Sequence, residues 1–163
     1  MNAEKAEFLK HRFVPLLRQI PTDKTPLWGK MTLQQMIEHF SDTMRIASGK
    51  MIYTDILTPP ENLQRMRDFI MSEKPFRENT MNPLMPEMPA PVVNPSVDEA
   101  IKELQKEIDF FFTVFEKNNL QVTRNPFFGD LNYEQNIQLL HKHALHHLKQ
   151  FGVDVPAPVK GDA

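Results

Sequence analysis

Histidines carry most of the chemistry that this sequence offers, and four of the six lie in one short stretch, from His141 to His147. In a helix each residue advances about 100° around the axis, so His143 and His147 lie one turn apart on the same face. Two imidazoles at this spacing can reach one metal ion. The same spacing also occurs on solvated helix surfaces, so a metal site is indicated only if a third ligand exists.

The apolar stripe of this helix indicates which histidines face inward. It consists of Tyr133, Ile137, Leu140, Ala144, Leu148 and Phe151. On the same helical projection His147 falls within the stripe and His143 at its edge, whereas His141 and His146 point sideways or outward. A buried imidazole without a partner costs free energy, so His147 at an apolar position favours a bound ligand over a solvated face.

A third candidate ligand, His39, lies in an earlier helical segment. This segment begins with Thr32-Leu-Gln-Gln35, which matches a capping box, and ends at Gly49. His39 lies on the flank of its apolar stripe. Three neutral imidazoles leave at least one coordination position for water or substrate, as in reactive metal sites. From the residues alone, a metal site at His39, His143 and His147 and a solvated histidine face are equal alternatives.

Three further residues near these histidines each allow more than one interpretation. Glu38 precedes His39 but points about 100° away from it, so we expect a solvated carboxylate. Asp42, one turn after His39, either orients that imidazole or stays on the surface. Trp28, the single tryptophan, either anchors the turn before the helix or lines a pocket.

Four segments carry a helical period of apolar residues, at about 3–20, 32–49, 96–119 and 132–152. Pro15 falls within the first and is expected to kink or shorten it. The third begins with the capping-box pattern Ser96-Val-Asp-Glu99, and its phenylalanine-rich stripe predicts core packing. No segment alternates convincingly as a strand. The sequence therefore predicts an all-α fold, an antiparallel four-helix bundle.

A long excursion rich in proline and methionine, residues 51–95, separates the second and third of these helices. It holds eight of the 14 prolines and six of the ten methionines, and only residues 61–73 within it predict a short helix. Such a segment either covers a pocket adaptably or wraps the flank of a bundle. We expect one domain over residues 1–153, followed by a flexible tail over residues 154–163.

Composition excludes several classes of function. The chain has 163 residues and no cysteine, which rules out disulfides, thiolate metal sites and cysteine nucleophiles. A net charge of −2 without a basic run makes nucleic acid an unfavourable partner, and five scattered glycines form no phosphate loop. No apolar stretch is long enough to span a membrane and the N-terminal residues lack the features of a signal peptide, so we expect a cytoplasmic protein.

Several motifs together resemble the DinB-like superfamily of metalloenzymes, also called YfiT-like. The family pattern combines a histidine of the second helix with HxxHHxxQ late in the fourth, which here reads His143-Ala-Leu-His-His147-Leu-Lys-Gln150. Residues 26–32, 35–39 and 125–129 are similar to one branch of that superfamily. The likeness covers about residues 8–153.

The resemblance implies an up-down-down-up four-helix bundle with a long insertion. It also implies a divalent metal, usually zinc or nickel, held by His39, His143 and His147, with His146 as an additional histidine that is not a ligand. Some members of the superfamily transfer low-molecular-weight thiols. The resemblance therefore implies a metal-dependent thiol transferase, or a hydrolase, that acts on small molecules.

Two functions of different classes follow from these observations. The first is an enzyme-like metal site for a small, partly apolar molecule with a metal-seeking group. Its pocket is expected to be lined by Met36, Phe40, Tyr133 and Ile137, with Arg45, Lys142 and Lys149 as the nearest fixed positive charges. The alternative is a regulatory or scaffolding bundle, in which the metal is structural or vestigial and residues 51–95 bind a partner. A homodimer through an exposed helix face is compatible with either function.

Overall fold

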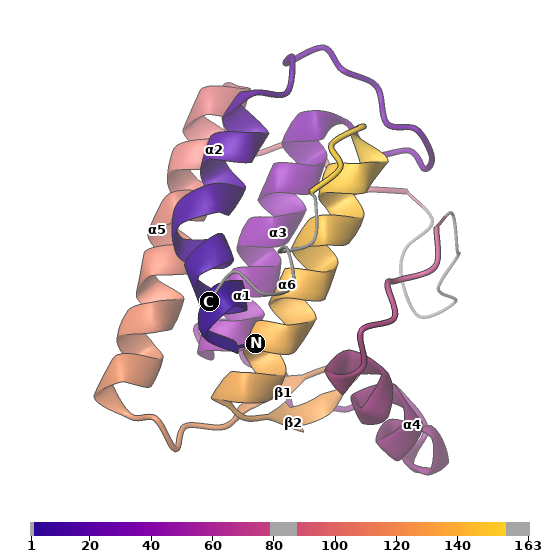
Figure 1. Ribbon diagram of the computed structural model, residues 1–163, viewed down its shortest axis with the longest axis vertical. Coiled ribbons are helices and arrows are strands. Elements are labelled where there is room, and N and C mark those ends of the chain that lie inside the picture. The colour runs from indigo at the N-terminus through magenta and orange to yellow at the C-terminus, as the bar shows by residue number, and fades with distance from the viewer. Residues whose placement is uncertain (1, 79–87, 156–163) are drawn as a thin grey trace, which may run out of the picture.

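The computed structural model describes residues 2–78 and 88–155, and this part of the chain is mostly helical. The elements follow in the order α1 (Asn2–Glu7), η1 (Phe8–Arg12), α2 (Phe13–Arg18), α3 (Leu33–Ser48), α4 (Pro60–Met71), α5 (Val97–Lys117), β1 (Thr123–Asn125), β2 (Gly129–Leu131) and α6 (Tyr133–Gln150). Figure 1 shows α2, α3, α5 and α6 side by side along the long axis of the molecule, with α4 and the hairpin at one end. The prediction of a mostly helical chain is confirmed.

Side-chain caps begin the three long helices where the sequence predicted them. The Thr32 hydroxyl accepts a hydrogen bond from Gln35 N, and the Gln35 side chain accepts one from Thr32 N, so α3 has a complete capping box. Asn132 and Gln135 make the same reciprocal pair at the start of α6. Ser96 caps α5 by accepting from the backbone of the residue three positions on. These caps fix where the helices that carry the histidines begin.

The N-terminal helical run is continuous but irregular around its proline. Pro15 lies in the first turn of α2, directly after the five-residue π-helical turn η1. Proline has no backbone N–H and its ring crowds the preceding turn, so a wider turn accommodates it without ending the helix. The expected irregularity at Pro15 is confirmed, and it takes the form of a π-helical turn.

The main core lies between α2, α3, α5 and α6, and it is apolar. Its largest fully buried side chains include Phe13, Phe40, Phe111, Phe151, Leu9, Leu17, Leu33, Met36, Ile37, Met44 and Leu104. The phenylalanines of α5 pack against one another there, with the rings of Phe111 and Phe115 5.0 Å apart. Their predicted role in the core is confirmed.

A short β hairpin, which the sequence did not predict, joins α5 to α6. Strands β1 and β2 pair antiparallel, with Thr123 opposite Leu131. The Asn125 side chain accepts hydrogen bonds from the backbone N–H groups of Phe127 and Phe128, which closes the turn. Strands of three residues are too short to show an alternating pattern, and this is why the hairpin was missed.

Helix α4 confirms the short helix expected in the 51–95 excursion, although it spans Pro60–Met71 rather than residues 61–73. A second small apolar cluster forms where α4 meets the hairpin and α6; it consists of Ile70, Phe128, Leu131 and Leu139. Residues 156–163 of the expected tail lie outside the described residues, whereas Val155 packs against the main core. Among the residues described, none of the helices combines the length and apolar character needed to cross a membrane.

Candidate metal centre

The three histidines proposed as ligands meet at one point between α3 and α6. His39 Nε2 lies 3.3 Å from His143 Nε2, and His143 Nε2 lies 2.8 Å from His147 Nε2. One nitrogen from each ring lies within 4.8 Å of the other two, close enough to hold a metal ion. Within residues 2–78 and 88–155 no other group of three such side chains converges in this way.

The packing of the helices leaves room for these rings. Helix α3 packs closely along α5 but much more loosely along α6. His143 and His147 project from successive turns of α6 into this wider space, and His39 meets them from α3. The spacing along α6 places two rings on one face, and the separation of the helices lets the third ring reach them.

Burial keeps the three rings uncharged. Desolvation lowers the pKa of His39, although the negative charge of Asp42 opposes this shift. Desolvation also lowers the pKa of His143 well below its usual value, and the rings of His147 and His39 act in the same direction. The pKa of His147 falls to about 3 for the same main reason. Neutral imidazole is the form that binds a metal, so all three rings are ready to act as ligands at neutral pH.

Gln150 determines which ring nitrogen of His147 carries the proton. Gln150 Nε2 donates to the carbonyl oxygen of Trp28 at 3.0 Å, which orients the amide so that its oxygen faces His147. Gln150 Oε1 lies 2.8 Å from His147 Nδ1, and because a carbonyl oxygen only accepts, Nδ1 donates. The lone pair of His147 is therefore on Nε2, directed toward the other two histidines.

The turn before α3 is shaped to receive Gln150. Gly29 has a φ of +79°, and a Cβ at this position would lie 3.0 Å from Gln150 Nε2. In return, Leu27 N donates to the carbonyl oxygen of Gln150 at 2.7 Å. The Trp28 ring lies 5.5 Å from that of His146. Trp28 therefore anchors this turn on α6, and it also lines a surface hollow with Leu27 and Lys149.

The distances between the ring nitrogens are close to those that a bound metal imposes. A tetrahedral ion bound at about 2.0–2.1 Å holds its ligand nitrogens about 3.3–3.4 Å apart. The 3.3 Å between His39 and His143 matches this value, whereas the 2.8 Å between His143 and His147 must widen by about half an ångström. Three converging lone pairs repel one another unless a proton or cation lies between them. The donor set therefore fits a divalent ion that binds imidazole.

Aromatic rings surround the three histidines. Phe40, fully buried on α3, has its ring centroid 5.2 Å from that of His143 and 6.4 Å from that of His147. The ring centroid of Phe76 lies 5.8 Å from that of His143.

The expectation that Tyr133 lines the site is wrong, because its ring packs on the phenylalanines of α5. Tyr133 begins α6, and His143 lies ten residues later, about 15 Å along the helix.

Glu38 and Asp42 have different roles from one another. The prediction that Glu38 is solvated is wrong: it accepts hydrogen bonds from Val93 N at 2.8 Å and from Asn94 N at 3.0 Å. The end of the excursion lies against α3 there, which a helical projection cannot reveal. Asp42 stays on the surface and accepts from Arg45 Nη1 at 2.7 Å, so of its two considered roles the surface one holds.

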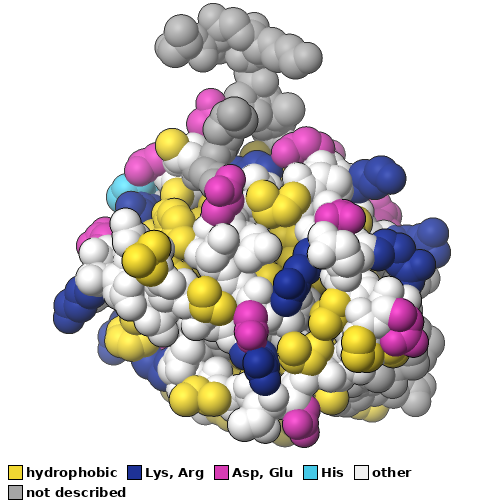
Figure 2. All heavy atoms as spheres, turned by 90° about the horizontal axis from the view of Figure 1, so that it is seen from below, with side chains coloured by type: hydrophobic (Ala, Val, Ile, Leu, Met, Phe, Trp, Pro, Cys, Tyr) yellow, Lys and Arg dark blue, Asp and Glu magenta, His cyan; other side chains and the backbone are white. Residues whose placement is uncertain are grey.

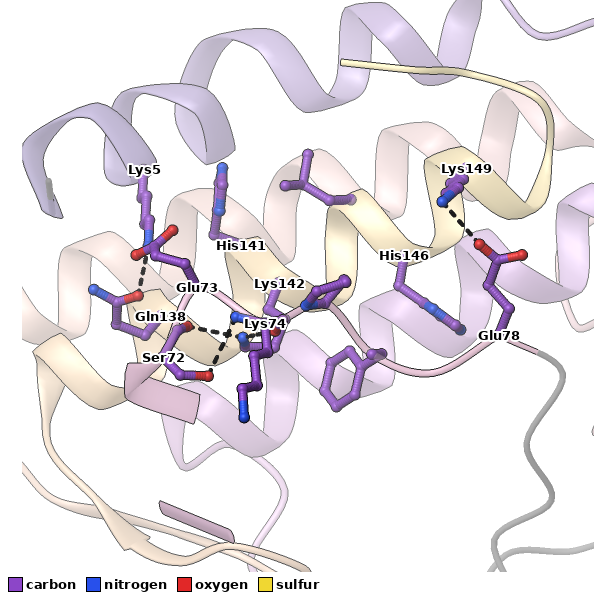
Figure 3. Close-up of a pocket in the computed structure, with 13 residues that line it drawn as sticks. Lys5, Ser72, Glu73, Lys74, Glu78, Gln138, His141, Lys142, His146 and Lys149 are labelled. Carbon is purple, nitrogen blue, oxygen red and sulfur yellow. Dashed lines mark hydrogen bonds and ion pairs between the residues drawn. The ribbon is translucent and has the colours of Figure 1, made fainter. Parts of the chain in front are cut away.

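A cavity of about 150 Å³ lies beside the site, on the outer side of α6 (Figure 3). His141 and His146 line this cavity and do not join the three-histidine group, in agreement with their sideways projection. Burial, assisted by the charge of Lys5, lowers the pKa of His141 to about 4. Lys142 also lines it and is only 8% exposed, a burial that the sequence did not indicate because lysine is typically solvated.

Comparison of the chain with protein-family models, with curated proteins and with solved structures finds no match. Functional evidence for this chain therefore comes from its own site. That site combines three neutral imidazoles with partly apolar surroundings, and the amide of Gln150 orients the ring of His147. His39 and His143 are partly accessible and His147 is buried, so the group is not fully enclosed.

Proposed function

We propose that this protein binds a divalent metal ion through His39, His143 and His147 and uses it as a reactive centre. The observation that carries the proposal is the convergence of three Nε2 atoms from two helices. Because three protein ligands leave a coordination position open, this donor set is typical of catalytic rather than structural sites. Imidazole donors suit zinc, nickel, copper and iron, and among these the resemblance to DinB-like proteins favours zinc or nickel.

The arrangement of the long helices supports the same assignment. In Figure 1 four helical segments lie side by side, with α5 and α6 on the outer sides and α2 and α3 between them, and this alignment supports an up-down-down-up four-helix bundle of the DinB-like kind. The 51–95 excursion corresponds to the long insertion. This proposal places the metal between the second and fourth helices of the bundle, α3 and α6.

The chain's own residues would prepare the centre for chemistry. Gln150 keeps the proton of His147 on Nδ1, so that Nε2 stays free to act as a ligand. Burial keeps the three imidazoles neutral, and Phe40 excludes water from one side. A bound divalent ion would supply Lewis acidity, which lowers the pKa of a bound water or thiol.

The proposed reaction is the transfer of a low-molecular-weight thiol or the hydrolysis of a small molecule. A partly apolar pocket with paired charges favours a small substrate with a thiol, carboxylate or carbonyl over a polyphosphate or nucleic acid. The resemblance adds weight to thiol transfer. A cytoplasmic location and a homodimer belong to the same proposal.

Metal analysis of matched variants tests the proposed centre. The native protein, loaded with zinc or nickel and then desalted, is expected to retain about one equivalent per chain, and His143→Ala and His147→Ala to retain almost none. His146→Ala is the matched control, since this histidine adjoins His147 in the same helix but lies outside the group. Equal metal content in all four proteins would contradict the proposal.

A turnover screen tests the reactive role. Zinc- and nickel-loaded protein is assayed with low-molecular-weight thiols and electrophilic acceptors, and with small esters and amides. The expected result is metal-dependent turnover that disappears in His147→Ala and persists in His146→Ala. Stoichiometric metal binding without any turnover would instead leave a structural or vestigial site.

A regulatory or scaffolding function is the second candidate, and apolar residues of the excursion favour it. Among the described residues of the excursion, the exposed large apolar side chains are Ile52, Tyr53, Leu57, Met71, Met88, Val92 and Val93. On the face shown in Figure 2, however, apolar side chains lie in small groups among charged ones. The thermal effect of metal removal distinguishes the two functions. A structural ion should raise the melting temperature strongly, whereas a reactive centre in a chain with its own core should tolerate metal loss.

A further inference from the structure

Residues 72–78, which we call the strap, run from the end of α4 along the outer side of α6. Figure 3 shows the strap beside α6, with Lys142 of the helix reaching toward Ser72 and Lys74. The strap has no helix or strand of its own. Its position is therefore determined by what holds it to the helices.

Lys142 holds the first half of the strap. Its ammonium group donates to the carbonyl oxygens of Ser72, at 2.9 Å, and of Lys74. The same group lies 4.5 Å from the centre of the Phe69 ring, on the last turn of α4. Hydrogen bonds from a charged group that is only 8% exposed are stronger than bonds at the surface, so this attachment is firm.

Exposed ion pairs hold the strap elsewhere. Lys5 pairs with Glu73 at 3.1 Å, where the Glu73 side chain is 85% exposed. Lys149 pairs with Glu78 at 2.8 Å, and both of these side chains are about half exposed. Ion pairs in contact with solvent contribute little to stability. The attachment through Lys149 and Glu78 is thus weaker than the attachment through Lys142.

Phe76 lies between the firm and the weak attachment, and it points at the histidines. Its ring centroid is 5.8 Å from that of His143 and 5.7 Å from that of His146, both in edge-to-face contact. Phe76 is itself only partly buried, and on its other side it packs on Phe69 at 5.4 Å. A partly buried ring close to a solvent-exposed ion pair can leave its place at moderate cost.

We propose that Phe76 determines which ligands reach the three-histidine centre. In the arrangement described, its ring covers the approach to His143 from the side of the strap, and movement of residues 76–78 away from α6 uncovers that approach. Small ligands would then be favoured over bulky ones, and a flat apolar group could take the place of the Phe76 ring. This inference rests on the proposed function, because Phe76 can select ligands only if the three histidines hold a metal ion that those ligands reach.

The first test measures the access to His143 without any metal. The metal-free full chain is treated with diethyl pyrocarbonate, which modifies neutral, accessible imidazoles, and each adduct is located by fragmentation mass spectrometry. Exposed His11 serves as the internal reference. We expect Phe76→Ala to increase the rate of His143 modification, relative to that of His11, about five- to ten-fold. In this variant no ring has to leave its apolar contacts before the reagent reaches His143.

Two further variants make this test specific. Phe127→Ala is the matched control, since Phe127 is also partly buried against the small cluster at α4, yet among the described residues its ring contacts no histidine. Lys142→Met keeps Phe76 but frees the first half of the strap, so it is expected to increase the rate at His143 as well. If neither Phe76→Ala nor Lys142→Met exceeds Phe127→Ala, the inference is overturned.

The second test uses Co²⁺, whose visible absorption reports both binding and ligand exchange. In Co²⁺-loaded protein we expect Phe76→Ala to lose its ion to a bulky chromophoric chelator about ten-fold faster than Phe127→Ala, while a small ligand such as cyanide shows little difference. Absence of Co²⁺ binding to native protein would overturn the proposed function and this inference together. Binding with equal chelator rates in the two variants would overturn the inference alone.

Discussion

The two sides of α3 are built differently, and the difference explains how one helix serves both stability and chemistry. Toward α5 the helices pack closely over an apolar core that includes the fully buried Leu104 and Phe111. Toward α6 they lie further apart, and the imidazoles of His39, His143 and His147 meet in the space between them. Dense apolar packing leaves no room for a ligand, whereas a wider, polar contact gives up packing energy to make room for one.

The polar groups at the edges of the two sides also differ. On the α5 side, Glu107 is nearly buried and accepts hydrogen bonds from Arg45 Nε at 3.2 Å and from Lys50 Nζ at 2.8 Å. The two basic side chains therefore neutralise the charge of this carboxylate. On the α6 side, the rings of His143 and His147 remain neutral because desolvation lowers the pKa of each. Acid should therefore weaken the α6 side first.

The largest expected effect is the loss of stability of the metal-free protein in acid. Burial holds the pKa of His147 at about 3 and lowers that of His143, against an ordinary value of 6.5 in the unfolded chain. The unfolded chain therefore binds more protons below pH 6.5, so this stability is complete above pH 6.5 and is lost as the pH falls toward 3. Each such group contributes a slope of up to about 1.4 kcal/mol per pH unit.

Urea unfolding of metal-free protein at pH 7, 6 and 5 measures this slope, in a range where few carboxylates titrate. His147→Gln removes one of the buried imidazoles and should make the dependence shallower. Equal free energies of unfolding at pH 7 and pH 5 would contradict the account of the α6 side.

The next largest effect is expected on the α5 side, from Phe111→Ala. Removal of a fully buried phenylalanine leaves a cavity and should lower the free energy of unfolding by about 3–5 kcal/mol. Phe110→Ala, the neighbouring residue with a ring that is 39% exposed, is the matched control and should change it far less. Metal content should stay at the native value in both variants; its loss in Phe111→Ala under folded conditions would show that the two sides are not independent.

A smaller effect is expected from Glu107→Gln at the edge of the α5 side. The change removes the charge from two hydrogen bonds of a nearly buried carboxylate and should lower the free energy of unfolding by about 1.5–2 kcal/mol. Asp98→Asn breaks the exposed pairs with Arg18 and Lys102 and serves as the control, with a much smaller effect. Thermal or urea unfolding measures both, and equal effects would mean that burial of Glu107 is unimportant.

The smallest effect is expected from the caps that begin α3 and α6. Thr32→Ala and Asn132→Ala each remove a side-chain acceptor from a complete capping box, at a cost of about 1 kcal/mol. Urea unfolding measures the cost, and Ser96→Ala at the start of α5 gives a third cap for comparison. A loss above about 3 kcal/mol would show that a cap does more than begin its helix.

Local features of the sequence were sufficient for most helix positions and for two of the three histidines. The capping-box patterns at Thr32 and Ser96 marked where α3 and α5 begin, and the proline at position 15 marked an irregular turn. The i, i+4 spacing placed His143 and His147 on one face. Each of these is decided within one or two turns of chain, where backbone geometry and a few side chains determine the outcome.

Contacts between distant segments explain what the sequence did not reveal about Glu38, Tyr133 and Lys142. Glu38 receives backbone N–H groups from the end of the excursion, and Tyr133 packs on α5 rather than near the histidines. Lys142 is buried because carbonyl groups of the strap accept its hydrogen bonds. The hairpin at 123–131 was missed for a different reason, because its strands are too short to alternate, although Asn125 closes its turn locally.

The sequence by itself determined that this chain is mostly helical, where its long helices begin, and that His143 and His147 share a face, because these follow from short-range periodicity and capping. Only the tertiary structure decided that His39 reaches them, since this depends on the distance between α3 and α6. It also decided the proton position on His147, through Gln150, and the place of Phe76 over the site. These last features arise from packing between segments far apart in the chain, which no local pattern encodes.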